Sequence, residues 1–277
     1  MTQEGFRLGA IVGAKSTLAI AATLIASSAT AWYLVAGQAG QMSDMVTGLA
    51  QVGSRMPNDA SVPIFMTMWL TMMVAMMFPT IMPMVLAHRM VVRHRGEGVT
   101  STIAFIGGYL AIWTAIGFIP LAAFLGFRGL PVDSTSLDWL YRLAGAIVVV
   151  AGLYQFTPVK ETCLSACRTP LRFIMSHDFS SGSRGAVRAG ISHGAFCVGC
   201  CWALMSVLVA VGLMNLAWMA GLAVIFLLEK NWRYGVAVKK LVGVGLALMG
   251  VLVVVHPELL VWVSGGQSAS VTGRLGW

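Results

Sequence analysis

All five cysteines of the chain lie in two short segments, and their spacing is typical of a metal site. They are Cys163, Cys167, Cys197, Cys200 and Cys201. Residues three or four apart share one face of a helix, so each segment would present its thiols together if it is helical. Two such faces brought together would offer soft thiolate ligands, which select Cu(I), Zn(II) or iron–sulfur clusters. His193, four residues before Cys197, is a candidate fifth donor.

A structural explanation of the same cysteines stays open at this point. Cysteine is a small apolar residue that packs well inside membrane helices without binding anything. If both segments face the reducing cytoplasm, metal binding is favoured over structural disulfides. Residues 168–192, between the segments, are rich in Ser, Gly and Arg. We expect them to form a loop, which permits the two segments to meet without requiring it.

A methionine-rich stretch is the second feature that could bind a soft metal. Residues 66–84 contain eight methionines, and thioethers are neutral ligands suited to Cu(I). Pro79 and a second proline interrupt the stretch, so we predict a kinked helix whose freed carbonyls can line a cavity. Met73, Met76 and Met77, beside Pro79, are the best candidates for a relay to the cysteines. Core packing is the competing explanation for the methionine stripe as a whole.

The composition indicates a membrane protein. Of the 277 residues 58% are hydrophobic and 10% are charged, and the mean hydropathy is +0.82. An ordinary soluble domain is about 45–50% apolar and about 25% charged. A soluble enzyme and a disordered or fibrous protein are therefore excluded. The net charge of +8 comes from residues lying between apolar runs, which argues for a lipid bilayer rather than nucleic acid as the partner.

The apolar runs predict an all-α polytopic membrane helix bundle. A bilayer core needs roughly 20 apolar residues per helix. We expect about seven transmembrane helices, or six if the fifth and sixth form one span. The predicted spans are 11–36, 62–87, 102–126, 137–156, 195–213, 216–228 and 241–256. Most lysines and arginines fall on one side when the N-terminus is cytoplasmic, which favours an N-in, C-out topology. Both cysteine segments then lie at the cytoplasmic ends of their helices.

The same topology divides the chain into four parts. They are an N-terminal transmembrane helix at 1–36, an outer loop at 37–61, a metal-binding bundle at 62–256 and an outer tail at 257–277. Residues 1–31 also resemble a signal peptide ending in the A-x-A site Ala29-Thr30-Ala31. The apolar stretch is longer than a usual signal core, so we favour a retained helix.

Ionisable residues are sparse in the predicted spans. Glu229 and Lys230 lie at the inner end of the sixth span. They either reach the interface as a surface pair or have a functional role. We expect no ionisable side chain near the membrane midplane, which argues against a proton-coupled transporter. The chain also contains no P-loop motif, so no ATPase domain is predicted.

Several motifs occur in an order that carries a family resemblance. The longest are Trp69-x2-Met72-x2-Ala75-Met76-Met77-x-Pro79-x3-Pro83, Cys163-Leu164-x2-Cys167-Arg168-x-Pro170 and His193-Gly194-x2-Cys197-x-Gly199-Cys200-Cys201-Trp202. With Met214-Asn215-x2-Trp218 and Glu229-Lys230, they resemble an uncharacterised bacterial family of predicted metal-binding integral membrane proteins. The resemblance runs from about Pro63 into the last predicted span. It implies a multi-pass protein of the inner membrane that binds metal, but neither a reaction nor a particular metal.

These observations favour a membrane protein that handles Cu(I) and is not an enzyme. It would transport copper, deliver it or assist the assembly of a copper enzyme, with another membrane or metal-carrying protein as partner. Zinc is the alternative metal. A thiol-redox or iron–sulfur membrane protein is the second hypothesis. The third is a non-catalytic structural subunit, because glycines permit close helix packing within the chain or with another chain. They are Gly107, Gly108, Gly145, Gly152, Gly243, Gly245 and Gly250.

Overall fold

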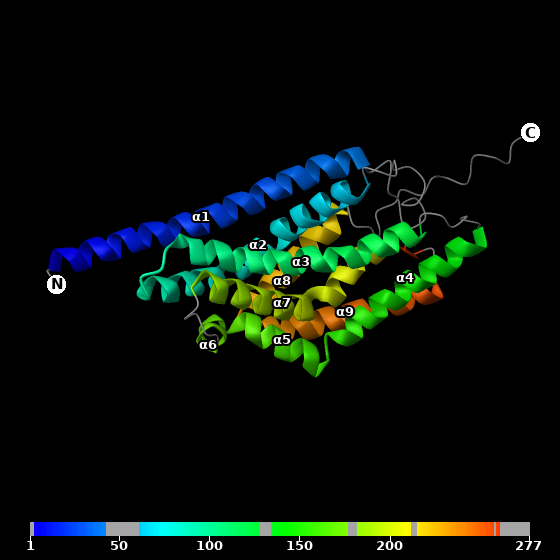
Figure 1. The fold of residues 1–277 in the computed structure, drawn as a ribbon. Helices are drawn as coiled ribbons and strands as arrows, with labels where there is room; N and C mark the ends of the chain where they lie inside the picture. The colour runs from blue at the N-terminus through cyan, green and yellow to red at the C-terminus, as the bar shows by residue number, and fades with distance from the viewer. Residues whose placement is uncertain are drawn as a thin grey trace, which may run out of the picture.

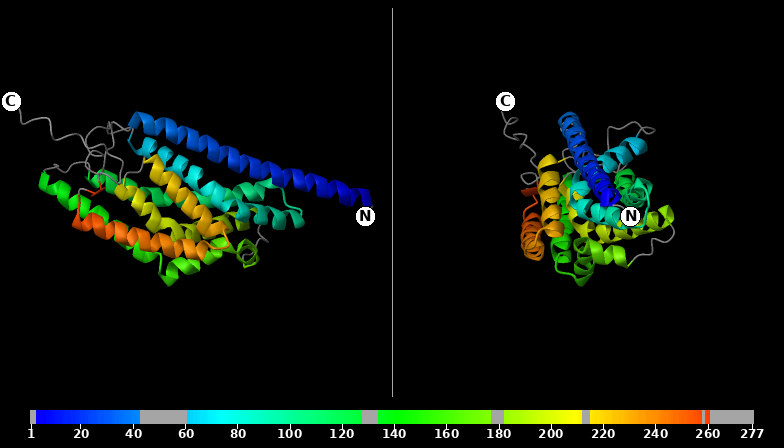
Figure 2. Two further views of the ribbon diagram at one scale, coloured as in Figure 1. Left: turned by 180° about the vertical axis from the view of Figure 1, so that it is seen from behind. Right: turned by 90° about the vertical axis from the view of Figure 1, so that its left-hand side faces the viewer.

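The chain folds into a bundle of helices, which confirms the all-α prediction for its described part (Figure 1). The computed structural model describes residues 3–42, 61–127, 134–176, 182–211, 215–257 and 259–260, and these contain no strand. The helices are α1 (Gln3–Met42), α2 (Ser61–His94), α3 (Val99–Phe127), α4 (Ser134–Tyr154), α5 (Pro158–Arg168), α6 (Pro170–Met175), α7 (Ser183–Val211), α8 (Leu216–Asn231) and α9 (Gly235–Val255). In Figure 2, α1 lies along α2 on one side of the bundle and α4 lies along α9 on another.

Five of the described helices are long and apolar enough to cross a membrane. They are Lys15–Gly37, Val62–His94, Val99–Ala123, Ser183–Val211 and Gly235–Val255. Together, α4 and α5 meet the same criterion as one span bent by 65°. The 16 residues of α8 fall short of it. The described helices therefore support five or six spans, while seven spans and the N-in, C-out orientation stay predictions.

The predicted division of the chain into four parts stays a prediction. Helix α1 is continuous to Met42, which lies within the segment 37–61 that was expected to form the outer loop. The rest of that loop, the turn expected at 212–215 except its last residue, and nearly all of the tail at 257–277 lie outside the described residues.

The bend between α4 and α5 has a local cause in the sequence. Pro158, the first residue of α5, has no N–H to continue the preceding helix. Thr157 takes an extended conformation (φ −73°, ψ 146°), and its hydroxyl accepts a hydrogen bond from the Lys160 N–H at 3.3 Å. A threonine cap followed by proline is a strong helix start. The chain therefore begins a new helix here, in a direction that carries α5 against α7.

One proline of α2 leaves a backbone carbonyl without its helical partner, and side chains of α1 donate to that carbonyl. Pro79 lacks the N–H that would bond to the Ala75 carbonyl four residues earlier. Two side chains of α1 donate to that carbonyl instead: the Ser28 hydroxyl at 2.8 Å and the Trp32 indole N–H at 3.0 Å. The expectation that this carbonyl lines a cavity was wrong, because α1 covers it.

Glycines bring two pairs of helices close together. A Cβ added to Gly152 of α4 would lie only 2.5 Å from the backbone nitrogen of Ala247 on α9. A Cβ on Gly108 of α3 would collide with the backbone of Val187 on α7. Gly145, Gly243 and Gly250 also lie in tight helix contacts, whereas Gly107 and Gly245 have no such neighbour within 4 Å. Most of the predicted glycine contacts are thus made within the chain.

Candidate metal centre

Three thiols lie together near the middle of α7. Cys197, Cys200 and Cys201 are almost completely buried, and their sulfurs lie within 4.8 Å of one another. The helical spacing predicted for them is confirmed. Their place in the helix was predicted wrongly, because α7 begins at Ser183 rather than near residue 195. The polar and small residues at its start continue the helix, so the thiols lie well inside it rather than at its end.

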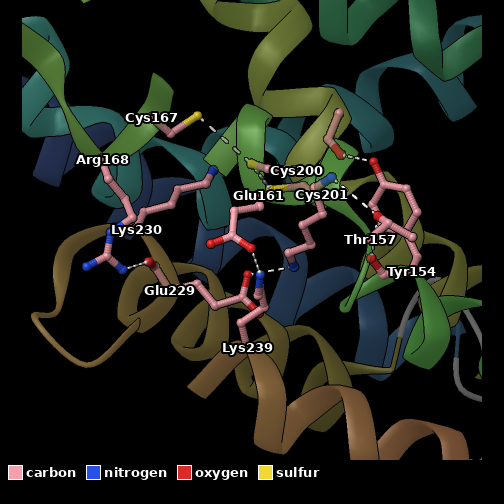
Figure 3. A network of polar contacts seen from close by, with 12 residues as sticks. Tyr154, Thr157, Glu161, Cys167, Arg168, Cys200, Cys201, Glu229, Lys230 and Lys239 are labelled. Carbon is pink, nitrogen blue, oxygen red and sulfur yellow. Dashed lines mark hydrogen bonds and ion pairs between the residues drawn. The ribbon is translucent and has the colours of Figure 1, made fainter. Parts of the chain in front are cut away.

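Helix α5 adds a fourth thiol to this group. The Cys167 sulfur lies 3.9 Å from the Cys200 sulfur, which in turn lies 3.3 Å from the Cys201 sulfur (Figure 3). The two cysteine segments therefore meet. The connection between them was expected to be a loop, but α6 and the start of α7 make much of it helical. We call Cys167, Cys197, Cys200 and Cys201 the thiol cluster.

Cys163 lies beside the thiol cluster, one helical turn before Cys167 on α5. Its sulfur packs against Gly199, where an added Cβ would lie 2.5 Å from it. The carbonyl of Gly199 accepts a hydrogen bond from the Tyr154 hydroxyl at 2.6 Å. A side chain at residue 199 would separate α5 from α7, so the glycine allows the close approach that brings Cys167 to the cluster.

Lys230 is a member of this site that sequence reasoning missed. Its ammonium lies 3.2 Å from the Cys197 sulfur, 3.8 Å from the Met77 sulfur and 3.4 Å from the Thr80 hydroxyl. Figure 3 shows the side chain directed toward the cysteines. Only 5% of Lys230 is exposed, so the alternative of a surface pair with Glu229 was wrong. The signal available in the sequence was a charged pair ending an apolar run.

Two ion pairs join α5, which carries Cys167, to α8 and α9. Lys160 and Glu229 are both buried and form a pair at 2.7 Å. Lys239, also buried, pairs at 3.2 Å with Glu161, which is 65% exposed. Sequence reasoning did not foresee these buried charges, and the expectation about the membrane midplane stays a prediction. The physical reason is pairing: a buried charge is tolerated when a partner of opposite sign compensates it, and α5 supplies both Lys160 and Glu161.

The end of α8 is tied to α5 by a single arginine. The Arg168 guanidinium donates to the carbonyls of Glu229 at 2.6 Å and Trp232 at 3.0 Å, at the C-terminus of α8 (Figure 3). The Glu229 carbonyl lies in the last turn of α8, where carbonyls lack helical partners, and a cation at this end also complements the helix dipole. The Trp232 carbonyl also accepts a hydrogen bond from the Gly235 N–H at 3.0 Å. The motif Cys167-Arg168 thus places one residue at the thiol cluster and the next at the helix that carries Lys230.

The predicted methionines are buried, and one of them contacts the site. Met73, Met76 and Met77 have at most 1% of their surface exposed. Met77 reaches the site through the ammonium of Lys230, which also contacts Cys197. Met73 lies one turn earlier on the same face of α2 as Met77. The burial fits core packing as well as a relay, so the relay stays a prediction.

His193 lies among aromatic rings one turn before Cys197. Its ring is 5.8 Å from that of Tyr109 and 5.3 Å from that of Phe173, between ring centroids. Tyr109 connects this group to the thiols, because its hydroxyl lies 3.2 Å from the Cys197 sulfur. His193 as a metal ligand stays a prediction. Tyr109 was missed because it lies on α3, far from the cysteines in sequence.

The donor set fits a soft metal ion. Four thiols converge in a buried site, and a thioether lies next to the lysine that contacts one of them. Thiolates and thioethers select Cu(I), and thiolates also bind Zn(II) in closed tetrahedral sites. Burial shields the sulfurs from bulk water. The arrangement can therefore hold a soft metal, and it offers more sulfurs than a low-coordinate Cu(I) ion requires.

Comparison with known proteins agrees with this chemistry. A family model described as "PpoB2: Copper chaperone" matches residues 66–253, which include the thiol cluster, His193 and the three predicted relay methionines. The matched region is more than half of the chain. No curated protein and no solved structure matches the chain.

Proposed function

The chain belongs to the PpoB2 copper chaperone family, and from that premise we propose that it binds Cu(I) as cargo in a membrane and delivers it to a copper-requiring partner protein. Family membership and the buried cysteines support a role of this chain in copper handling. The proposal adds the oxidation state of the metal, its ligands and the place where it is carried.

The convergence of α5 and α7 on one group of thiols is the observation that carries the proposal. We assign Cys167, Cys197, Cys200 and Cys201 as the sulfur donors. Cu(I) is satisfied by few thiolates, so spare sulfurs nearby allow one ligand to replace another as the ion leaves. A carrier needs this property, because each bond to the cargo must be exchanged for a bond to the partner.

The route to the cluster is proposed to follow the methionines of α2. Met73, Met76 and Met77 would pass the ion as a neutral thioether series, with Met77 the member nearest to Cys197 through Lys230. Cys163 and His193 flank the cluster and would serve as further donors during transfer. The five or six apolar spans support a place in a membrane. The bacterial inner membrane is proposed from the family resemblance, and a cytoplasmic N-terminus from the distribution of Lys and Arg along the sequence.

Metal analysis of the full-length chain tests the proposal. The chain would be purified anaerobically in detergent, loaded with Cu(I) or Zn(II), and its metal content determined beside a Cys197→Ser/Cys200→Ser variant. We expect about one copper per chain, lost in the double variant. Cys163 is proposed to act only during transfer, so Cys163→Ser is the matched control that keeps its resting copper. An unchanged copper content in the double variant would remove the thiol cluster from the mechanism, and a preference for zinc would overturn Cu(I) as the cargo.

A thiol-redox role is the second candidate, because Cys167 and Cys200 lie 3.9 Å apart between sulfurs. A disulfide requires about 2.05 Å, which a small movement of α5 against α7 would provide. Titration of free thiols before and after mild oxidation distinguishes this role. A chain that holds no copper, yet loses two thiols reversibly through Cys167 and Cys200, would favour it over copper delivery.

A further inference from the structure

We propose that Lys230 is the counter-ion of a negatively charged copper–thiolate complex, so that its charge governs how tightly the chain holds Cu(I). The inference rests on the proposed function and deepens it. It assigns a positioning residue that binds no metal itself and acts through Cys197. Its first support is geometric: the ammonium lies 3.2 Å from the Cys197 sulfur and 3.8 Å from the Met77 sulfur, deep in the bundle.

The other two buried lysines each pair with a carboxylate, and Lys230 does not. Lys160 has the carboxylate of Glu229 at 2.7 Å, and Lys239 has that of Glu161 at 3.2 Å. Among the described residues, the hydrogen-bonding contacts of Lys230 are with a thiol, a thioether and a hydroxyl, with no carboxylate. One positive charge in the interior is therefore left without a carboxylate of its own.

Glu229 and Lys230 are adjacent in sequence, but their side chains contact different groups. Glu229 directs its side chain to Lys160, and Lys230, the next residue, directs its side chain to the thiol cluster (Figure 3). The carboxylate nearest in sequence is therefore engaged elsewhere. A buried charge without a partner is costly, and the sulfurs are the groups placed to supply the missing negative charge.

A Cu(I) ion bound by two thiolates has the charge that the site requires. One positive charge and two negative ones leave a single negative charge on the complex, which one ammonium neutralises. A divalent ion in a closed site of four thiolates would carry two negative charges and leave one unbalanced. The charge of Lys230 thus favours a two-thiolate copper complex over a zinc site of four thiolates, independently of the softness of the donors.

The test changes the charge of Lys230 and measures Cu(I) affinity and apo stability separately. Full-length Lys230→Gln, Lys230→Arg and Lys239→Gln variants would be compared with the unmodified chain in detergent under anaerobic conditions. Competition with a chromophoric Cu(I) chelator gives the affinity, and thermal unfolding without metal gives the stability. Lys239→Gln is the matched control, because it removes another buried lysine, whose carboxylate partner is largely exposed.

We expect Lys230→Gln to weaken Cu(I) binding by about 10- to 100-fold, the range typical of groups that support metal ligands. Lys230→Arg should retain most of the affinity, and Lys239→Gln should stay close to the unmodified chain. The apo form of Lys230→Gln should unfold no earlier than the unmodified apo chain, because the substitution removes an uncompensated buried charge.

Three results with the variants would overturn the inference alone. Equal Cu(I) affinity in Lys230→Gln and the unmodified chain would show that the charge is irrelevant. Equal losses in Lys230→Gln and Lys230→Arg would show that shape matters instead of charge. A less stable apo Lys230→Gln whose folded fraction binds Cu(I) normally would show a role in folding alone. An unmodified chain that binds no Cu(I) would overturn the proposed function, and this inference with it, before any variant is measured.

Discussion

The Cys167 sulfur of α5 lies 3.9 Å from the Cys200 sulfur of α7, across 33 positions of sequence. This contact joins the two cysteine segments into one site. It depends on the break at Thr157–Pro158, which directs α5 against α7, and on Gly199, which leaves room for the approach.

Cys167→Ser should weaken Cu(I) binding at least as much as the about 10- to 100-fold loss seen for groups adjacent to metal ligands. The substitution removes the sulfur that α5 contributes to the cluster. Chelator competition on the purified chain measures the change, with Cys163→Ser, one turn away on the same helix, as the control. Equal affinities for the two variants would mean that α5 contributes no specific ligand.

Gly199→Ala should destabilise the folded chain by about 1–3 kcal/mol, the usual cost of overpacking. The new Cβ would lie 2.5 Å from the Cys163 sulfur and push α5 away from α7. Adding Cys163→Ala removes that sulfur and should recover much of the loss in both stability and Cu(I) affinity. A double-mutant cycle in thermal unfolding checks this, and additive effects of the two substitutions would argue against the contact as the cause.

Glu229→Gln should destabilise the chain by about 3–5 kcal/mol, because it leaves the Lys160 ammonium buried without its carboxylate. Glu161→Gln is the comparison on the second ion pair. Glu161 is 65% exposed, so its removal should cost only about 0–1 kcal/mol. Chemical unfolding in detergent measures both variants. Similar free energies of unfolding for the two would show that burial of the first pair does not matter.

Ser28→Ala combined with Trp32→Phe should destabilise the chain by about 1–3 kcal/mol, the cost of leaving a buried acceptor unpaired. Both side chains donate to the Ala75 carbonyl that Pro79 leaves without its helical partner. In a Pro79→Ala background the backbone N–H returns, so the same double substitution should cost much less. A cost independent of residue 79 would assign the effect to lost packing between α1 and α2.

Local pattern was enough to predict the helices and the spacing of the thiols on them. Cys197, Cys200 and Cys201 share a helical surface because three- and four-residue spacings place side chains on one face. The true start of α7 was hidden, because its first turns contain Ser and Gly and read as a loop. Gly190 lies against the backbone of Phe105 on α3, so tertiary contact supports helix where local propensity is weak.

The charged residues of the site could not be placed from sequence for a different reason. Lys230 sits at the end of an apolar run, where a lysine ordinarily extends to the membrane surface. Its burial follows from contacts with Cys197, Met77 and Thr80, which are distant in sequence and come together only in the folded bundle. Tyr109 was missed in the same way, since nothing near it in sequence points to Cys197.

In the membrane location proposed above, the hydrogen bonds from α1 to Ala75 bear on the order in which the helices insert. A carbonyl without a partner in lipid costs several kcal/mol, so the Pro79 turn of α2 is unfavourable there on its own. Because synthesis proceeds from the N-terminus, Ser28 and Trp32 are already made when Ala75 emerges. The first helix therefore holds, in advance, the donors that the second helix needs, and the two are best inserted side by side as a hairpin.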